Sequence, residues 1–415
     1  MSFSPARRTL LRHGFVGACA SVLAPRWLPA EVTVSGQRVA EIDAMMTRFM
    51  DQHAVTGAAI AVARQGRLVH VGGYGSADSE TNAPVQPHSL FRIASVSKPL
   101  TAVAILRLCQ QRKLKLSDRV TEVLQLSPID PRFEQVTVRH LLQHSGGFDR
   151  DASFDPMFRD VEISRAMGVP LPIDGESIVA YMLKRNLDFD PGTKYAYSNF
   201  GYLLLGNIVA QVSGQPYERF VRAELLQPIG VQRMRLGRTA RNEQRPDEVR
   251  YVPDQATSSP SVLTPDRPPV AGPYGRYQIE PMAAHGGWLA TAVDLVRFAT
   301  ALQGQTKPRL LTNTFQAEML APPEFHDAED AVHYGCGVQV RRLSNGRFNL
   351  WHNGSLDGTN SLWVMRHDGM AWAVLFNQRY GKARKQLAGL VDPQVHRAVD
   401  SVAQWPRHDL FARFL

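Results

Sequence analysis

Hydrophobic residues near the two ends of the chain are spaced as in strands, whereas those in the middle are spaced as in helices. Residues 41–53 carry apolar side chains at helical spacing and predict an amphipathic helix. Two apolar runs follow, over residues 58–64 and 67–73, with Gln65-Gly66 between them. A short glycine-containing turn between two such runs is typical of a β-hairpin. The N-terminal part therefore predicts a helix followed by a strand pair.

The last hundred residues return to strand-like patterns, with Asn-Gly and Asp-Gly turns between them. The predicted strands cover residues 334–342, 348–352, 361–366 and 370–377, and a helix is predicted over about 385–402. Because strands occur at both chain ends, we expect an α+β fold with one antiparallel β-sheet built from both ends and flanked by helices. An all-helical subdomain is inserted between them. The α/β part then covers about 35–112 and 330–415, and the helical part covers about 113–329.

A central helix is predicted from about Ser95 to Arg112. Its apolar residues occupy most of its surface, which is typical of a buried helix. Pro99 helps to place the start, since proline is tolerated in the first turn. Ser95 and Lys98 would then lie one turn apart on the same face, with Ser95 near the positive end of the helix dipole. An amine beside a serine can activate it as a nucleophile; the alternative is an N-capping serine beside an exposed lysine.

Two further segments of the middle region bear on a functional site. Residues 149–175 show no periodicity and are expected to be irregular, and eight prolines between 238 and 281 predict a long loop draped over the site. Tyr197 and Asn199 follow a Pro-Gly turn and precede a leucine-rich helix expected from about Gly201. A phenol can carry a proton to and from a serine, and an amide can hold a substrate carbonyl. The alternatives are a packed tyrosine and an N-capping asparagine.

The composition excludes several classes of protein. The chain has only three cysteines, which rules out a disulfide scaffold. His140 and His144 are four residues apart, but Leu141 stands where a metalloprotease helix needs glutamate. We therefore expect core-packed or capping histidines, with no metal site and no cofactor. The net charge of +9 comes from scattered basic residues without a long run, so no nucleic-acid partner is expected.

The first 30 residues have the layout of a bacterial export signal. Arg7-Arg8 is followed by an apolar run over residues 14–23, and the paired arginines favour the twin-arginine route. The run is too short to span a membrane as a helix of the mature chain. We expect an exported, periplasmic or secreted protein; the alternatives are an unstructured basic tail and a lipid-anchored Cys19.

Three short motifs occur in a fixed order: Ser95-Val96-Ser97-Lys98, Tyr197-Ser198-Asn199 and His352-Asn353-Gly354. With their flanks they resemble the serine β-lactamase and penicillin-binding-protein superfamily over about residues 40–380. The closest resemblance is to class C β-lactamases, D-alanyl-D-alanine carboxypeptidases and family VIII esterases. It implies an antiparallel sheet flanked by helices, an all-helical domain, and a site in the cleft between them.

The resemblance also implies a role for each matching residue. Ser95 would be the acyl-accepting nucleophile. Lys98 would assist its deprotonation, and Tyr197 would carry the proton to the leaving group; which of these two is the general base stays open. Asn199 would bind the acyl-side amide or ester. The backbone N–H groups of Ser95 and Ser355 would form the oxyanion hole.

The third motif departs from the usual pattern. It begins with His352, where typical class C β-lactamases carry lysine, and Gly354 completes it beside the substrate. Lysine is a fixed cation suited to a substrate carboxylate, whereas histidine near pH 7 is mostly neutral. Histidine here resembles some carboxypeptidases, aminopeptidases and esterases of the superfamily.

These observations predict a serine hydrolase that forms an acyl-enzyme on Ser95 and hydrolyses esters or D-amino-acid amide or peptide bonds. The alternatives are a true β-lactamase and a catalytically silent peptidoglycan-binding or scaffold protein. An α/β-hydrolase would need G-x-S-x-G, which the sequence lacks. The expected partner is a small-molecule ester, peptide or β-lactam, and the oligomeric state is left open.

Overall fold

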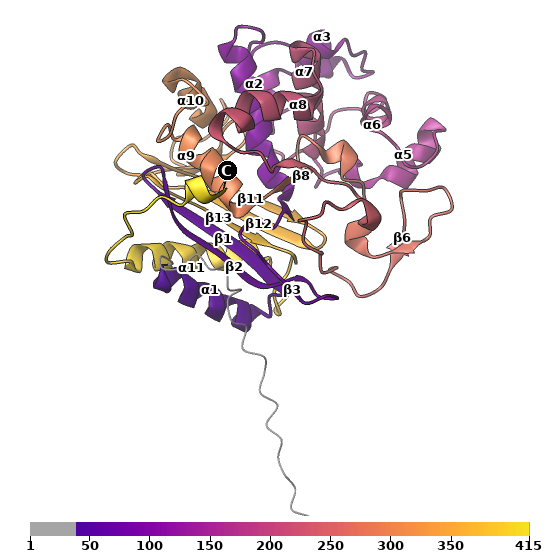
Figure 1. Cartoon of the computed structure of the whole chain (residues 1–415). Helices are drawn as coiled ribbons and strands as arrows, with labels where there is room; N and C mark the ends of the chain where they lie inside the picture. The colour runs from indigo at the N-terminus through magenta and orange to yellow at the C-terminus, as the bar shows by residue number, and fades with distance from the viewer. Residues whose placement is uncertain (1–38, 415) are drawn as a thin grey trace, which may run out of the picture.

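The computed structural model describes residues 39–414 and has an eight-stranded antiparallel sheet with helices on both faces (Figure 1). Across the sheet the strands run β3 (Ala83–Pro84), β2 (Arg67–Asp78), β1 (Gly57–Arg64), β13 (Met370–Phe376), β12 (Thr359–Met365), β11 (Phe348–Leu356), β10 (Gln339–Arg342) and β9 (Val332–Tyr334). The two chain ends meet where β1 pairs with β13, with Ile60 opposite Val374. The α+β fold and the sheet built from both ends are confirmed.

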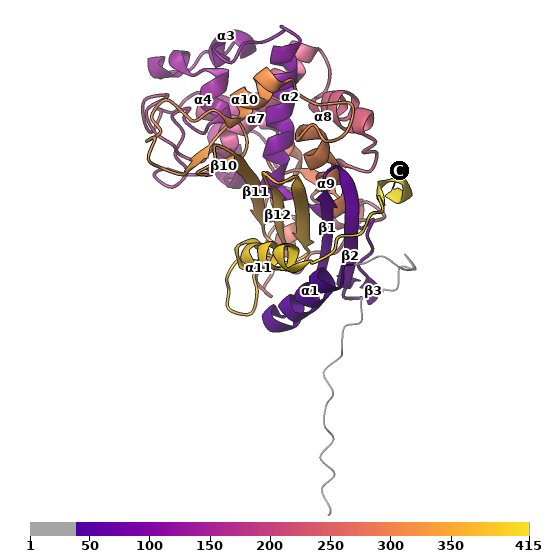
Figure 2. The same cartoon turned by 90° about the vertical axis from the view of Figure 1, so that its left-hand side faces the viewer.

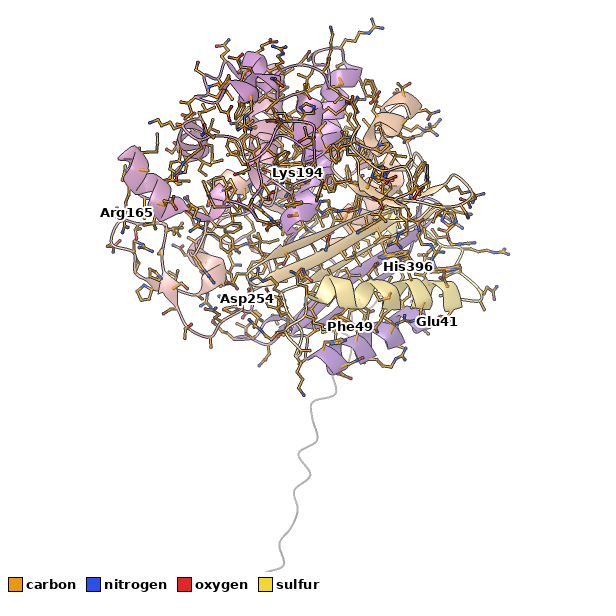
Figure 3. The ribbon with its side chains drawn as sticks, turned by 180° about the vertical axis from the view of Figure 1, so that it is seen from behind. Glu41, Phe49, Arg165, Lys194, Asp254 and His396 are labelled. Carbon is orange, nitrogen blue, oxygen red and sulfur yellow. The ribbon has the colours of Figure 1, made fainter. Side chains whose placement is uncertain are left out.

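Both faces of the sheet are buried, and alternate residues of each strand serve different faces. In β1, Ile60 and Val62 point to the face covered by α1 (Ala40–His53) and α11 (Leu387–Ser401), while the intervening alanines point to α9 (Ala292–Leu302). Figure 2 shows α1 and α11 together on one face, and Figure 3 shows them from behind. The small alanine side chains let α9 pack closely on the sheet.

Large side chains lie on both faces: Trp363 of β12 stacks on Phe298 of α9, and the aromatic side chains of β13 lie on the opposite face. Trp372 and Phe376 of β13 join the core beneath α1 and α11, and the rings of Phe49 and Phe376 lie 5.7 Å apart. Full burial of such side chains contributes roughly 1.5–3 kcal/mol each. This layer holds the strands that carry the candidate site.

The helical part lies on the same side of the sheet as α9. Its helices are α2 (Ser97–Gln110), α3 (Val120–Leu124), α4 (Val138–Leu142), α5 (Asp160–Met167), α6 (Gly175–Met182), α7 (Asn199–Ser213), α8 (Tyr217–Val221) and α10 (Asn313–Leu320). Helix α2 packs along α7, and every residue of α2 from Ser97 to Leu106 is buried. The predicted buried central helix is confirmed.

Three expectations need correction. Residues 334–342, expected to form one strand, instead form parts of two strands, β9 and β10, because the chain turns at Gly335 and Gly337. A Cβ on Gly337 would lie 2.4 Å from the Cβ of Ala102. Residues 149–175 contain α5, a short amphipathic helix. Helix α9 falls within the range expected for the helical part, 113–329, yet it packs on β1 and β13. Helical periodicity identifies such an element but does not say what it packs against.

The proline-rich segment 238–281 has little regular structure beyond the strand pair β6 (Ser259–Pro260) and β7 (Pro269–Val270). It is fastened to β4 (Phe91–Arg92), the strand that leads into the Ser95 turn. The buried guanidinium of Arg92 donates to the carbonyls of Pro273 and Arg238, at 2.5 and 2.8 Å. These hydrogen bonds fix this part of the segment beside the strand that leads to Ser95.

The predicted export signal, residues 1–30 with Cys19, lies outside the described residues and stays a prediction. Within residues 39–414, no helix has the length and apolar character that crossing a bilayer requires.

Candidate active site

Ser95 lies in a single 3-10 turn, Ala94–Val96, immediately before α2. The turn is held on both sides. The N–H of Ile93 donates to the carbonyl of Trp288 at 3.0 Å, and the carbonyl of Ile93 accepts from the hydroxyl of Ser361 at 2.7 Å. The expected helix start near Ser95 is thus correct to within two residues. The hydroxyl sits on a rigid connection between strand and helix, at the positive end of the α2 dipole.

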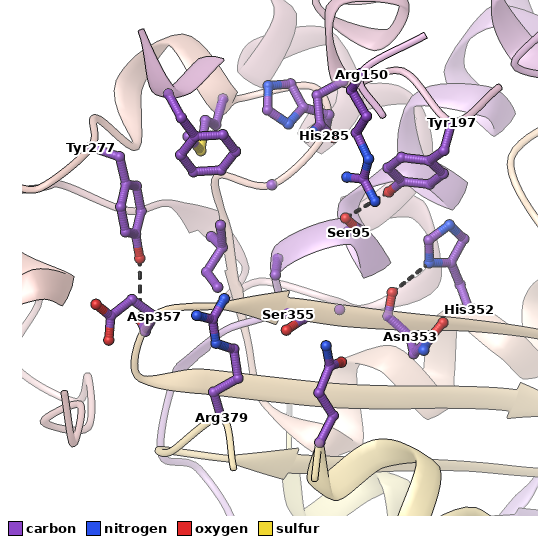
Figure 4. Close-up of a pocket in the computed structure, with 18 of the residues that line it drawn as sticks. Ser95, Arg150, Tyr197, Tyr277, His285, His352, Asn353, Ser355, Asp357 and Arg379 are labelled. Carbon is purple, nitrogen blue, oxygen red and sulfur yellow. Dashed lines mark hydrogen bonds between the residues drawn. The ribbon is translucent and has the colours of Figure 1, made fainter. Parts of the chain in front are cut away.

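The structure brings Ser95, Lys98 and Tyr197 together, and Figure 4 shows Ser95 beside Tyr197. The Lys98 ammonium donates to Ser95 Oγ at 3.2 Å, and the Tyr197 hydroxyl donates to the same oxygen at 2.7 Å. Lys98 also donates to the side-chain oxygen of Asn199 at 2.8 Å and to the backbone carbonyl of His285 at 3.1 Å. The Ser95 oxygen thus has two proton-carrying neighbours.

Burial shifts both of these neighbours toward their neutral forms. Lys98 is fully buried, and this desolvation lowers its pKa well below 10.5; Arg150 lowers it further, while Asp155 opposes the shift. Burial raises the pKa of Tyr197, although its hydrogen bond to Ser95 acts in the opposite direction. At neutral pH the tyrosine is therefore a phenol, and the lysine can reach its amine form more readily than a lysine in water.

Asn199 is the first residue of α7, with Ser198 as the N-cap, so it does not lie on the expected loop. Its side-chain oxygen accepts from Lys98, and its side-chain nitrogen donates to Asp155 at 2.6 Å. Asn199 lines the cavity as expected, but both polar atoms of its amide are already engaged by the protein. Its direct effect is to orient the Lys98 ammonium.

Asp155 is a residue that the sequence did not reveal. It lies in the stretch without periodicity, just before a 3-10 turn that begins at Pro156. Only the fold brings its carboxylate to Asn199, 44 residues away in sequence.

His352 is buried and neutral. Its Nε2 faces the Tyr334 hydroxyl at 2.9 Å, and its Nδ1 faces the carbonyl of Asn353 at 2.7 Å. Since a carbonyl can only accept, the proton lies on Nδ1 and Tyr334 donates to Nε2. Burial, and then the charge of Lys98, lower the pKa of His352 to about 3. The residue lines the cavity as expected but presents no cation there, and Tyr334 is a partner that the sequence did not indicate.

Gly354 lets strand β11 approach the Ser95 turn. A Cβ at this position would lie 2.2 Å from the carbonyl oxygen of Ile93 and 2.3 Å from Ser361 Oγ. Strand β11 pairs with β10 only as far as Trp351. Beyond Trp351, this edge of β11 makes no pairing with β10. Ser355 lies on this stretch and lines the cavity, and its buried hydroxyl has no hydrogen-bond partner within the described chain.

Replacing Gly354 by alanine is expected to lower the free energy of unfolding by about 1–3 kcal/mol, because the added methyl group forces strand and turn apart. Ester hydrolysis should fall as well, since the same shift moves Ser355 away from Ser95. Denaturant unfolding and an ester assay measure the two effects. The matched control is Gly389→Ala on an exposed position of α11, where nothing lies within 4 Å of the added Cβ. Equal stability of both variants would contradict the steric argument.

The two histidines of the central segment have structural contacts. His140 forms a capping box with Thr137 at the start of α4, and Nδ1 of His144 accepts from the Ser198 N–H at 3.1 Å. These contacts agree with the capping and core-packed interpretation. Within residues 39–414, no three His, Cys, Asp or Glu side chains are grouped so that they could hold a metal ion.

Ser95 opens into a cavity of about 660 Å³. Tyr197 and His352 lie near one end of it, and Tyr277 and Asp357 lie near the other (Figure 4). This volume falls in the range of small-molecule sites.

This fold, with a serine, lysine and tyrosine gathered at the head of a buried helix, defines a class: the serine β-lactamase and penicillin-binding-protein superfamily. Residues 42–395 match the family model described as Beta-lactamase, and the chain belongs to that family.

Relatives within this family have varied names. The chain is 27% identical over 322 residues to a probable fimbrial assembly protein FimD, serogroup H1, of Dichelobacter nodosus, covering 76% of this chain and 73% of that one. It is 30% identical over 204 residues to esterase EstB of Burkholderia gladioli, covering 46% of this chain and half of the esterase. The solved D-amino acid amidase of Ochrobactrum anthropi SV3 is similar with a TM-score of 0.67 at 22% identity, over 87% of this chain and 97% of that chain. This last likeness concerns the fold alone.

Proposed function

We propose that this protein is a serine hydrolase that forms an acyl-enzyme on Ser95 and acts on esters or on amide bonds of D-amino acids. The observation that carries the proposal is the pair of contacts to Ser95 Oγ, one from the Lys98 ammonium and one from the Tyr197 hydroxyl. Both groups can move a proton, and the serine between them faces a cavity large enough for a small acyl compound.

In the acylation step Ser95 Oγ attacks the substrate carbonyl while its proton passes to the neutral amine of Lys98. The lowered pKa of Lys98 supports it as the base, and the raised pKa of Tyr197 argues against a phenolate base. The backbone N–H groups of Ser95 and Ser355 would stabilise the oxyanion. When the intermediate collapses, the bond to the leaving group breaks. Tyr197 gives its proton to that group and regains one from Lys98.

Deacylation reverses these roles. A water molecule attacks the acyl carbon, its proton passes through Tyr197 and Lys98, and the bond to Ser95 Oγ breaks as the oxygen is reprotonated. The name of one relative, esterase EstB, supports ester substrates. The neutral, fully hydrogen-bonded His352 favours these over β-lactams, because no fixed cation stands at the start of the third motif. A true β-lactamase is the second candidate, supported by the family itself.

Intact-mass spectrometry after incubation with a labelled penicillin, beside a p-nitrophenyl ester assay, tests the proposal. A lasting adduct on Ser95 together with ester turnover would support the esterase or amidase. Rapid loss of penicillin without a lasting adduct would point to the β-lactamase. If neither an adduct nor ester turnover is observed, the enzyme proposal is overturned in favour of a silent scaffold on the same fold.

A further inference from the structure

The cavity at Ser95 adjoins a second one. Phe158 and Arg276 line both the Ser95 cavity and a neighbouring cavity of about 750 Å³. Phe158 comes from the turn before α5, and Arg276 comes from the proline-rich segment 238–281. Because both residues line both cavities, they lie at the boundary between the two. A path past them would lead an acyl chain from Ser95 into the outer cavity.

The outer cavity carries an excess of positive charge. Its lining includes four arginines: Arg159, Arg165, Arg267 and Arg276. Across residues 39–414, none of the four forms an ion pair with a carboxylate. Arg165 lies on α5 at the outer edge of the molecule (Figure 3). Four guanidinium groups without a paired acid therefore surround one hollow of the surface.

The two acids of this lining are engaged elsewhere. Asp160 is buried and accepts from the Gln278 side chain at 2.6 Å, and Glu162 accepts from the Tyr181 hydroxyl at 2.6 Å. A hydrogen bond from a neutral group does not remove the charge of a carboxylate, and Glu162 also pairs with Arg185 at 3.7 Å. Four arginines against two acids nevertheless leave this lining with an excess of positive charge.

The inner cavity contains two further arginines, and each of them has an acid partner. Arg150 lies over the Tyr197 ring at 4.5 Å and pairs with Asp151 at 3.7 Å, and Arg379 is paired with Asp254. Asp357 is the one acid among the described residues of the inner lining, and its carboxylate accepts from the Asp254 N–H at 2.7 Å. The arginines without an acid partner therefore lie in the outer cavity and, with Arg276, at its boundary with the inner one.

The direction of this path identifies the part of the substrate that enters it. Tyr197, which serves the leaving group in the proposed reaction, lies near one end of the inner cavity. Tyr277, the neighbour of Arg276 in sequence, lies near the opposite end, beside Asp357 (Figure 4). The arginine-lined path therefore lies at the end opposite Tyr197, and we assign it to the acyl portion because Tyr197 serves the leaving group in the proposed reaction.

We propose that this path is a subsite for acyl groups that carry a carboxylate several atoms from the scissile bond. The inference rests on the proposed acyl-enzyme function. Guanidinium forks bind carboxylates through paired, charge-assisted hydrogen bonds. Phe158, which is 44% exposed and 5.6 Å from the Tyr277 ring, offers an apolar contact for the chain that links the two ends of the acyl group.

The test compares two p-nitrophenyl esters of one eight-carbon diacid, with the far end either a free carboxylate or a methyl ester. We expect kcat/KM to be at least about tenfold higher for the free carboxylate at low salt, because hydrogen bonds to charged groups are the stronger ones. The preference should fall severalfold in 0.5 M NaCl, since exposed charges are screened. Arg276→Gln should reduce the ratio at least about fivefold, and Arg165→Gln should reduce it less.

Arg48→Gln, an exposed arginine of α1 on the far face of the sheet, is the matched control for the change in net charge and should leave the ratio unchanged. Equal kcat/KM for the two esters, with Ser95 acylated normally, would overturn the subsite and leave the hydrolase proposal standing. If neither ester is turned over, calorimetric titration decides. Tighter binding of the free carboxylate that is lost in Arg276→Gln would support the subsite, and equal binding would overturn it.

Discussion

Replacing Ser95 by alanine is expected to lower kcat/KM for a p-nitrophenyl ester by at least about 10³-fold, since the proposed covalent step has no other acceptor. The fold should survive. Ser95 is only partly buried, and its oxygen accepts the two hydrogen bonds from Lys98 and Tyr197 without carrying a packed side chain. We expect the free energy of unfolding to change by no more than about 1–2 kcal/mol. Steady-state kinetics and denaturant unfolding measure the two effects.

The control for this variant lies in the same segment. Ser97 is buried at the start of α2, and its hydroxyl faces the Trp288 N–H at 3.4 Å rather than the cavity. Ser97→Ala should retain most of the activity and lose the ability to accept that bond. Undiminished turnover in Ser95→Ala, or loss of turnover in both variants to the same degree, would remove Ser95 from the role of nucleophile.

Replacing Lys98 by methionine is the second change with a very large expected effect, again about 10³-fold or more in kcat/KM, because the proposed base is lost. Unlike most core substitutions it should not lower stability at pH 7. A buried ammonium is costly to desolvate, and methionine has a similar length without the charge. Lys98→Met is therefore expected to lose activity without losing stability.

The pH dependence gives the sign of this stability effect. The folded-state pKa of Lys98 lies well below its unfolded value, so the unfolded chain binds more protons between those two values. The stability of the parent protein therefore rises with pH through this window, and the advantage of Lys98→Met should shrink toward pH 10. Lys113→Met, at an exposed lysine, should show no such pH-dependent difference. A Lys98→Met protein that is less stable than the parent at pH 7 and gains on it as pH rises would contradict the assignment.

The same shift governs activity. Kinetics on a neutral ester should show kcat/KM of the parent rising with pH as Lys98 loses its proton, and reaching its plateau well below pH 10.5.

Much of the site could be predicted from local spacing. Residues three positions apart lie on one face both in a 3-10 turn and in an α-helix, so the pairing of Ser95 with Lys98 follows from their spacing although Ser95 precedes α2. The burial of α2 followed from apolar residues on all sides of one helix. The assignment of both chain ends to one sheet followed from strand-like patterns at both ends.

Other parts of the site depend on contacts that no spacing encodes. Asp155 reaches Asn199 across 44 residues, and Tyr334 reaches His352 across 18. Asn199 was predicted to hold substrate, but its amide is shared between Lys98 and Asp155. Gly354 was predicted as part of a binding motif, and its distance from Ile93 shows that it also permits close packing.

By itself the sequence determined the α+β architecture, the Ser95–Lys98 pair and the family resemblance, because alternation, helical period and short motifs are properties of neighbouring residues. Only the tertiary structure decided the protonation of the site and the path for the acyl group. Burial of Lys98 and His352 sets their charge, and the junction at Phe158 and Arg276 arises where two irregular segments meet. The pKa of a side chain and the charge of a cavity depend on what surrounds a residue in space, and that is fixed only when distant segments pack.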